Sequence, residues 1–82
     1  MIGLVSDYFD TISVAAINII DGTLQLGDTI HIKGIKTDFE TTVESMQINR
    51  LPVLIANAGD SIGLKVSHPV RKKDVVYKVL NN

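Results

Sequence analysis

Alternation of apolar and polar residues with a period of two is the feature that most constrains the fold of this chain. Ile30 and Ile32 alternate with polar neighbours, and the same pattern recurs in residues 61–66 and 74–79. This period places the apolar side chains on one face of a β-strand, as in a half-buried sheet. No segment sustains the apolar period of about 3.6 residues that marks a helix. The sequence therefore predicts an all-β fold.

Three further stretches, residues 2–8, 12–19 and 41–48, are candidate strands, which brings the expected number to at least six. Turn residues separate the strands at short spacing, as in a sandwich or a barrel. A chain of 82 residues is long enough for one domain, which we predict to span residues 1–82. Because the chain has no cysteine, packing alone must hold this domain together.

A Gly-Asp pair precedes two of the predicted strands. Gly27 and Asp28 come before residues 29–33, and Gly59 and Asp60 come before residues 61–66. Gly adopts a positive φ without steric cost, and the Asp carboxylate can accept hydrogen bonds from nearby backbone N–H groups. We predict that these four residues form structural turns. A third copy carries Lys73 in place of Gly, so we expect its turn to differ in geometry.

The run from Gly22 to Thr29 has the glycine spacing of a phosphate-binding loop. Such a loop requires a Lys where this chain has Asp28, because a cation and backbone amides must neutralise the phosphate. A carboxylate at that position would repel phosphate, and a strand pattern follows instead of a helix. The sequence therefore predicts no nucleotide binding.

The candidate catalytic side chains do not form a recognisable site. His31 and His68 have no Cys or second His at metal-ligand spacing, so we predict no metal site and no cofactor. Ser67 is adjacent to His68, and adjacent strand residues point to opposite faces, so we expect no nucleophile–base pair. Asp38 and Glu40 could share a strand face, and we interpret them as a charged edge. We predict no catalytic residue and no enzymatic activity.

Charge is unevenly distributed, although the net charge is −1. Residues 1–64 carry three basic against eight acidic residues, whereas residues 65–82 carry five basic against one acidic residue. This asymmetry can mark a surface for phosphate or for an acidic protein, or it can be a solvated terminal hairpin. The candidate residues for binding RNA or a partner, placed around a hairpin between the last two strands, are Lys65, His68, Arg71, Lys72 and Lys73.

No signal peptide or membrane segment is evident. Asp7 and Asp10 interrupt the N-terminal apolar residues before they reach the length of a signal sequence. We expect a cytoplasmic protein without membrane contact. Residues 53–56 form an unusual apolar run, which either is exposed as an interface or closes one end of the fold.

Three blocks of sequence resemble domain II of the translational GTPases, such as elongation factor Tu and initiation factor 2. Residues 21–30 resemble its glycine turn, residues 43–48 its following strand, and residues 56–64 its Ala-x-Ala-Gly-Asp-x-Val-Gly-Leu stretch. The resemblance implies a small closed six-stranded Greek-key barrel. It also implies contact with RNA or the ribosome.

From this resemblance we predict a free-standing, non-catalytic module associated with RNA or the ribosome. A similar barrel ends some collagenase-like peptidases. The alternative hypothesis is therefore a protein-interaction module that binds a protein partner. It would be a detached accessory barrel of a larger enzyme, such as a collagenase-like peptidase.

Overall fold

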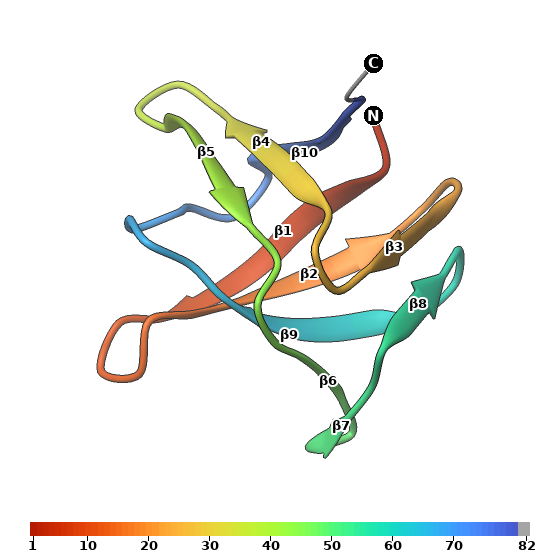
Figure 1. Ribbon diagram of the computed structural model, residues 1–82. Coiled ribbons are helices and arrows are strands. Elements are labelled where there is room, and N and C mark those ends of the chain that lie inside the picture. The colour runs from red at the N-terminus through yellow and green to blue at the C-terminus, as the bar shows by residue number, and fades with distance from the viewer. Residues whose placement is uncertain (81–82) are drawn as a thin grey trace.

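The computed structural model describes residues 1–80, which form strands joined by turns and loops (Figure 1). In these residues no helix is long and apolar enough to cross a membrane. The strands are β1 (Gly3–Phe9), β2 (Val14–Ile19), β3 (Thr23–Gln25), β4 (Thr29–Lys33), β5 (Asp38–Thr42), β6 (Met46–Ile48), β7 (Leu51–Pro52), β8 (Ile55–Asn57), β9 (Ser61–Lys65) and β10 (Val75–Val79).

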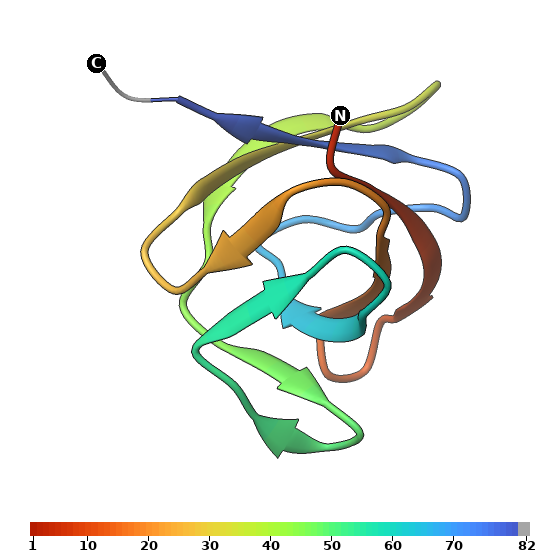
Figure 2. The same ribbon diagram turned by 90° about the vertical axis from the view of Figure 1, so that its right-hand side faces the viewer.

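Eight strands form one antiparallel sheet in the order β5-β4-β10-β1-β2-β9-β6-β7, and β3 pairs with β8 in a second, two-stranded sheet. The large sheet curls strongly (Figures 1 and 2), so that β5, at one end of the strand order, comes to lie near the segment that follows β9. The all-β prediction is confirmed. The predicted closed barrel of six strands differs from the structure, because the two end strands β5 and β7 do not pair with each other within residues 1–80.

The additional strands arise partly because the chain leaves the sheet within stretches that the apolar pattern predicted as single strands. The predicted strand at residues 41–48 is broken at residues 43–45, which separate β5 from β6. A strand of two or three residues shows too little alternation to be recognised in the sequence, and β3, β7 and β8 are all of this kind. The strand count therefore differs although the fold class does not.

The core lies inside the curl of the large sheet and is aliphatic. Three of its members, Ala15, Ile17 and Ile19, come from β2, and full burial of an aliphatic side chain stabilises by about 1.5–3 kcal/mol. The buried apolar residues are Ile2, Val5, Ala15, Ile17, Ile19, Leu24, Ile30, Ile32, Val43, Met46, Ala56, Ile62, Leu64, Val66, Val70 and Val76.

One strand presents the face opposite to its sequence pattern. In β10 the apolar alternation of Val75, Tyr77 and Val79 suggested that these residues face the core. Val76 is instead fully buried, and Tyr77 is 41% exposed. The register explains this difference, because Val76 lies directly opposite Ile32 of β4 and opposite residues share a face.

The two Gly-Asp pairs lie in tight turns. Gly27 has a φ of 92° and Gly59 a φ of 97°. The carboxylates of Asp28 and Asp60 each accept a hydrogen bond from the backbone N–H three residues earlier, at 3.0 Å and 2.8 Å. A positive φ at the third residue of a four-residue turn is typical of a type II turn, for which Gly is preferred.

The third copy keeps the same geometry. Asp74 accepts a hydrogen bond from the backbone N–H of Arg71 at 2.9 Å, and Lys73 has a φ of 74°. The expectation that this turn would differ is therefore wrong. The Asp side chain and its backbone bonds fix the turn, and Lys73 is held in a left-handed conformation that costs about 1–2 kcal/mol for a residue with a Cβ.

Candidate functional site

The basic segment does not form the turn of a hairpin. β9 pairs with β2 and β6, whereas β10 pairs with β1 and β4. Residues 66–74 therefore cross from one part of the large sheet to another, and we name them the crossover. Lys65 ends β9 before the crossover, and Arg71, Lys72 and Lys73 lie at its other end. The predicted hairpin is thus wrong, and Lys65 lines none of the cavities that those three cations line.

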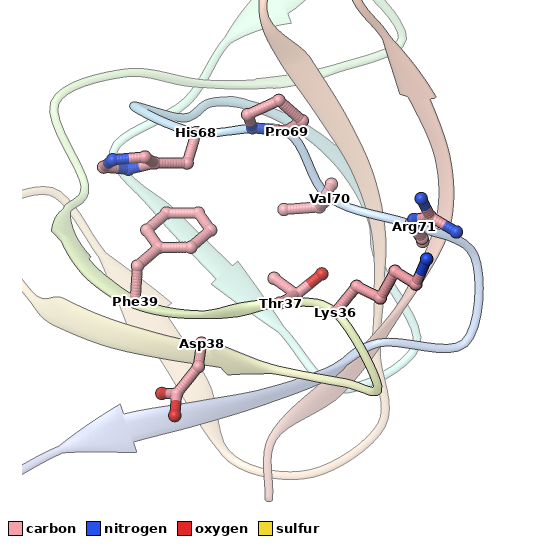
Figure 3. A pocket seen from close by; sticks show the side chains of 8 residues that line it. All are labelled: Lys36, Thr37, Asp38, Phe39, His68, Pro69, Val70 and Arg71. Carbon is pink, nitrogen blue, oxygen red and sulfur yellow. The ribbon is translucent and has the colours of Figure 1, made fainter.

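Two cavities meet where the crossover approaches the turn between β4 and β5. The first has a volume of about 510 Å³ and the second about 290 Å³, and both are lined by Lys36 and Arg71. Figure 3 shows these two side chains side by side at one end of the first cavity. The second cavity is also lined by Lys33, Lys72 and Lys73. We name these five exposed cations, Lys33, Lys36, Arg71, Lys72 and Lys73, the basic cluster.

The sequence analysis missed two members of the basic cluster. Lys33 and Lys36 belong to the half of the chain that carries an excess of acidic residues. Only the folded sheet brings the β4–β5 turn beside the end of the crossover. Within residues 1–80 none of the five cations forms an ion pair with a carboxylate. The cluster is therefore a positively charged surface, and the buried Asp74 also lines the second cavity.

A groove continues from the basic cluster along β5. The first cavity lies between residues 36–39 on one side and residues 68–71 on the other. A further cavity of about 330 Å³ lies between residues 41–45 and residues 65–67. The two cavities follow the same pair of segments, which run in opposite directions. We name this groove, between residues 36–45 and residues 65–71, the seam.

The seam has an apolar floor beside its basic end. Thr37 and Val70 are buried there, each 4% exposed. The rings of Phe39 and His68 contact each other across the seam, with centroids 4.8 Å apart and a tilt of 50°. Figure 3 shows both rings at the end of the first cavity opposite Lys36 and Arg71, and it shows Asp38 pointing away from the cavity. His68, the remaining predicted site residue, therefore lines the seam and lies outside the basic cluster.

Asp38 and Glu40 share the outer face of β5, and both approach His31 of β4. The distance from His31 Nε2 to Asp38 Oδ1 is 2.5 Å, and that from His31 Nδ1 to Glu40 Oε2 is 3.8 Å. No group of His, Cys, Asp or Glu side chains in residues 1–80 could hold a metal ion. Both carboxylates are exposed, and the Asp38 side chain points away from the first cavity, although its backbone helps to line it (Figure 3).

Ser67 and His68 lie within hydrogen-bond distance, although the sequence analysis expected their side chains to point to opposite faces. Ser67 Oγ lies 3.1 Å from His68 Nδ1. The reasoning failed because both residues lie in the crossover and not in a strand, so their side chains need not point to opposite faces. Both are exposed, and among residues 1–80 no side chain hydrogen-bonds to the other ring nitrogen of His68. A serine nucleophile needs a base that a third group orients, and this pair lacks that group.

Residues 53–56 differ in burial. Ala56 is fully buried, whereas Leu54 is 75% and Ile55 48% exposed, so the run both closes the core and presents an apolar surface. Leu51 is 67% exposed on the hairpin of β6 and β7, which projects from the rest of the molecule (Figure 2). We name Leu51, Leu54 and Ile55 the apolar patch.

Asp28 makes the glycine run of residues 22–29 a structural turn. Its carboxylate lies 3.3 Å from Lys78 Nζ and also accepts a backbone hydrogen bond from Gln25. Both interactions would be lost if a nucleotide phosphate displaced the carboxylate. We therefore expect titration calorimetry with GTP and Mg²⁺ to give no heat of binding, and a micromolar dissociation constant would contradict this prediction.

Comparison with known proteins finds sequence similarity to a protease. No family model matches the chain. The chain is 44% identical over 77 residues to an uncharacterized protease of Methanocaldococcus jannaschii, and the match covers 93% of this chain but only 19% of that protease. The chain thus spans about a fifth of the relative's length.

The fold is that of a solved peptidase domain. The C-terminal domain of a Geobacillus thermoleovorans "putative U32 peptidase" superimposes with a TM-score of 0.91 at 18% identity, covering 98% of this chain and 92% of that one. Its selenomethionine variant gives a TM-score of 0.85 at 18% identity, covering 90% and 93%.

These findings correct the family resemblance drawn from the sequence. The assignment to domain II of the translational GTPases is wrong, and so is the prediction of a translation module associated with RNA or the ribosome, because the similarity found is to a protease and to a peptidase domain. The Gly-Asp blocks that suggested the resemblance are turn chemistry, which unrelated β folds can share. The alternative hypothesis, an accessory domain of a larger enzyme, is the better one.

Proposed function

We propose that this domain is a non-catalytic accessory module of a peptidase of the U32 type, acting in the cytoplasm on a protein partner. The observation that carries the proposal is the identity of 44% with one fifth of a protease. Most of that protease lies outside the matched region, which leaves room for its catalytic machinery. The fold of the Geobacillus domain supports the same proposal.

The chemistry of the described residues agrees with a role in binding. Residues 1–80 contain no group of metal ligands, and the Ser67–His68 pair has no orienting partner. Leu51, Leu54 and Ile55, three large apolar side chains that are exposed within five residues of sequence, offer a surface suited to contact with the catalytic part, since exposed apolar patches mark interaction sites.

A chimera tests this function. In the Methanocaldococcus protease the matched fifth is replaced by this chain, and hydrolysis of unfolded casein is compared for the parent, the chimera and the protease without that fifth. We expect the truncated protease to lose most of its activity, the chimera to recover it, and this chain alone to give none.

Two results would contradict the proposal. Hydrolysis by the isolated chain that disappears with Ser67→Ala would make the domain an enzyme. Full activity of the truncated protease, with no change when the domain is restored, would show that the module serves neither catalysis nor the binding of casein. If a chimera with Leu54→Asp keeps full activity, this result contradicts the proposed role of the apolar patch but not the proposed function of the domain.

A further inference from the structure

β5 is an end strand whose backbone has free hydrogen-bonding capacity. It pairs with β4 on one side and is the first strand of the large sheet, so no strand of residues 1–80 pairs with its other side. That side faces the seam, where the crossover approaches β5 without backbone hydrogen bonds to residues 38–42. An unpaired strand edge is a template on which an extended chain can add.

The register identifies which backbone groups are free. Gly34 N–H donates to the carbonyl of Thr37 at 2.7 Å, and Val43 N–H donates to that of Asp28 at 2.8 Å. Hydrogen-bonded pairs alternate with non-bonded pairs in an antiparallel ladder, so the odd-numbered residues from 37 to 43 bond toward β4. The N–H and C=O groups of Asp38, Glu40 and Thr42 consequently point toward the open side.

The basic cluster gives this edge a preferred ligand chemistry. Lys36 and Arg71 stand at the end of the seam where β5 begins, with Lys33, Lys72 and Lys73 beside them. These cations have no carboxylate partner within the described part of the chain. A carboxylate of a bound peptide would form charge-assisted hydrogen bonds there, while Thr37 and Val70 provide an apolar floor for a neighbouring side chain.

A second copy of this chain fits the same edge poorly. Two β5 strands paired antiparallel would bring their outward side chains, Asp38 and Glu40, against each other. Like charges at directly opposite positions destabilise strand pairing, and outward charges on an edge strand are a common protection against self-association. Pairing of two β5 strands is thus disfavoured, whereas a peptide without this negative charge can still pair with the edge of β5.

We propose that the seam binds an extended segment of a substrate polypeptide, which adds to β5 as a further strand and places an acidic residue between Lys36 and Arg71. The segment supplies the missing partners for Asp38, Glu40 and Thr42. The inference rests on the proposed function in one respect, namely that the bound segment belongs to a substrate of the peptidase. Binding of a peptide by the isolated chain can be measured without the catalytic part. The module then holds an unfolded stretch for the peptidase.

The test uses a blocked peptide of alternating Thr and Val with Glu near one end, added to the ¹⁵N-labelled chain. Backbone amide exchange and chemical shifts are followed by NMR. In the free chain the amides of Asp38, Glu40 and Thr42 should exchange fast, and in the bound chain they should be protected. A peptide with Lys in place of Glu should bind about tenfold more weakly, since charge-assisted bonds at the basic end are lost. A peptide methylated on alternate backbone nitrogens should not bind.

Variants separate strand addition from simple charge attraction. Arg71→Glu should weaken binding of the Glu peptide about tenfold, whereas Arg50→Glu, an equal change of charge at an exposed position on the β6–β7 turn, should leave it unchanged. Perturbation of the basic cluster without protection of the three amides would overturn the proposal, as would equal binding of the methylated peptide. A free chain that is already dimeric, with those amides protected, would assign the edge to a second copy instead.

Failure of this experiment and failure of the proposed function are distinguishable. If the chimera restores casein hydrolysis while no peptide protects the β5 amides, the module acts through another surface and only the seam proposal falls. If the amides are protected but the chimera is inactive, the domain captures peptides outside any peptidase.

Discussion

Gly34→Ala is expected to destabilise this domain by about 2–3 kcal/mol, because a side chain there would overlap a buried, hydrogen-bonded carboxylate. A Cβ on Gly34 would meet Oδ1 and Cγ of Asp74. Asp74 is 5% exposed and is held by its hydrogen bond from Arg71 N–H, so it cannot swing into solvent without breaking the turn before β10. For a domain of this size the loss corresponds to a fall in melting temperature of about 10 °C or more.

Gly63→Ala is the matched control for this substitution. A Cβ on Gly63 would lie 3.5 Å from Val14 Cγ1, which is an ordinary van der Waals contact. Its melting temperature, measured by circular dichroism, should stay close to that of the parent.

A double-mutant cycle with Asp74→Ala isolates the clash from other effects. Asp74→Ala alone should destabilise, since the turn loses its side-chain bond. Gly34→Ala should then add little, because the space is free. Strict additivity of the two losses would show that the overlap is not their cause.

Local features of the fold could be predicted from the sequence because each depends on a few neighbouring residues. The alternation around Ile30 and Ile32 indicates a strand wherever it occurs, and both residues are fully buried in β4. The positive φ values of Gly27 and Gly59 follow from turn chemistry that four consecutive residues contain. The same local character explains the mistaken family: turns and short strands are shared by β folds that have different functions.

The candidate site could not be predicted, because it depends on which strands are neighbours. Alternation with a period of two indicates which face of a strand is buried, but it does not determine which strands are its neighbours in the sheet. β10 was expected beside β9, whereas it lies between β4 and β1. Because of that placement, the crossover passes residues 36–39, and Arg71 comes to lie beside Lys36, more than thirty residues away in sequence. The seam and the basic cluster follow from this one connection, and the open edge of β5 follows from its place at the end of the strand order.

Gly59→Val and Lys73→Gly are expected to change stability in opposite directions, although both sites occupy the third position of the same kind of turn. Gly59 has a φ of 97°, and nothing lies within 4 Å of a Cβ built there. A β-branched residue would therefore be penalised by the backbone conformation alone, by about 1–3 kcal/mol. Lys73 already carries such a penalty at a φ of 74°.

Lys73→Gly should relieve the left-handed strain and gain about 0.5–1 kcal/mol, once the greater freedom of Gly in the unfolded chain is subtracted. Urea denaturation gives both free energies. Gly59→Asn serves as the control, because Asn tolerates a positive φ and should cost less than Val. The turn at Gly59 would need another explanation if Val and Asn were equally destabilising. A loss of stability in Lys73→Gly would mean that the Lys73 side chain contributes more to the folded state than its backbone strain removes.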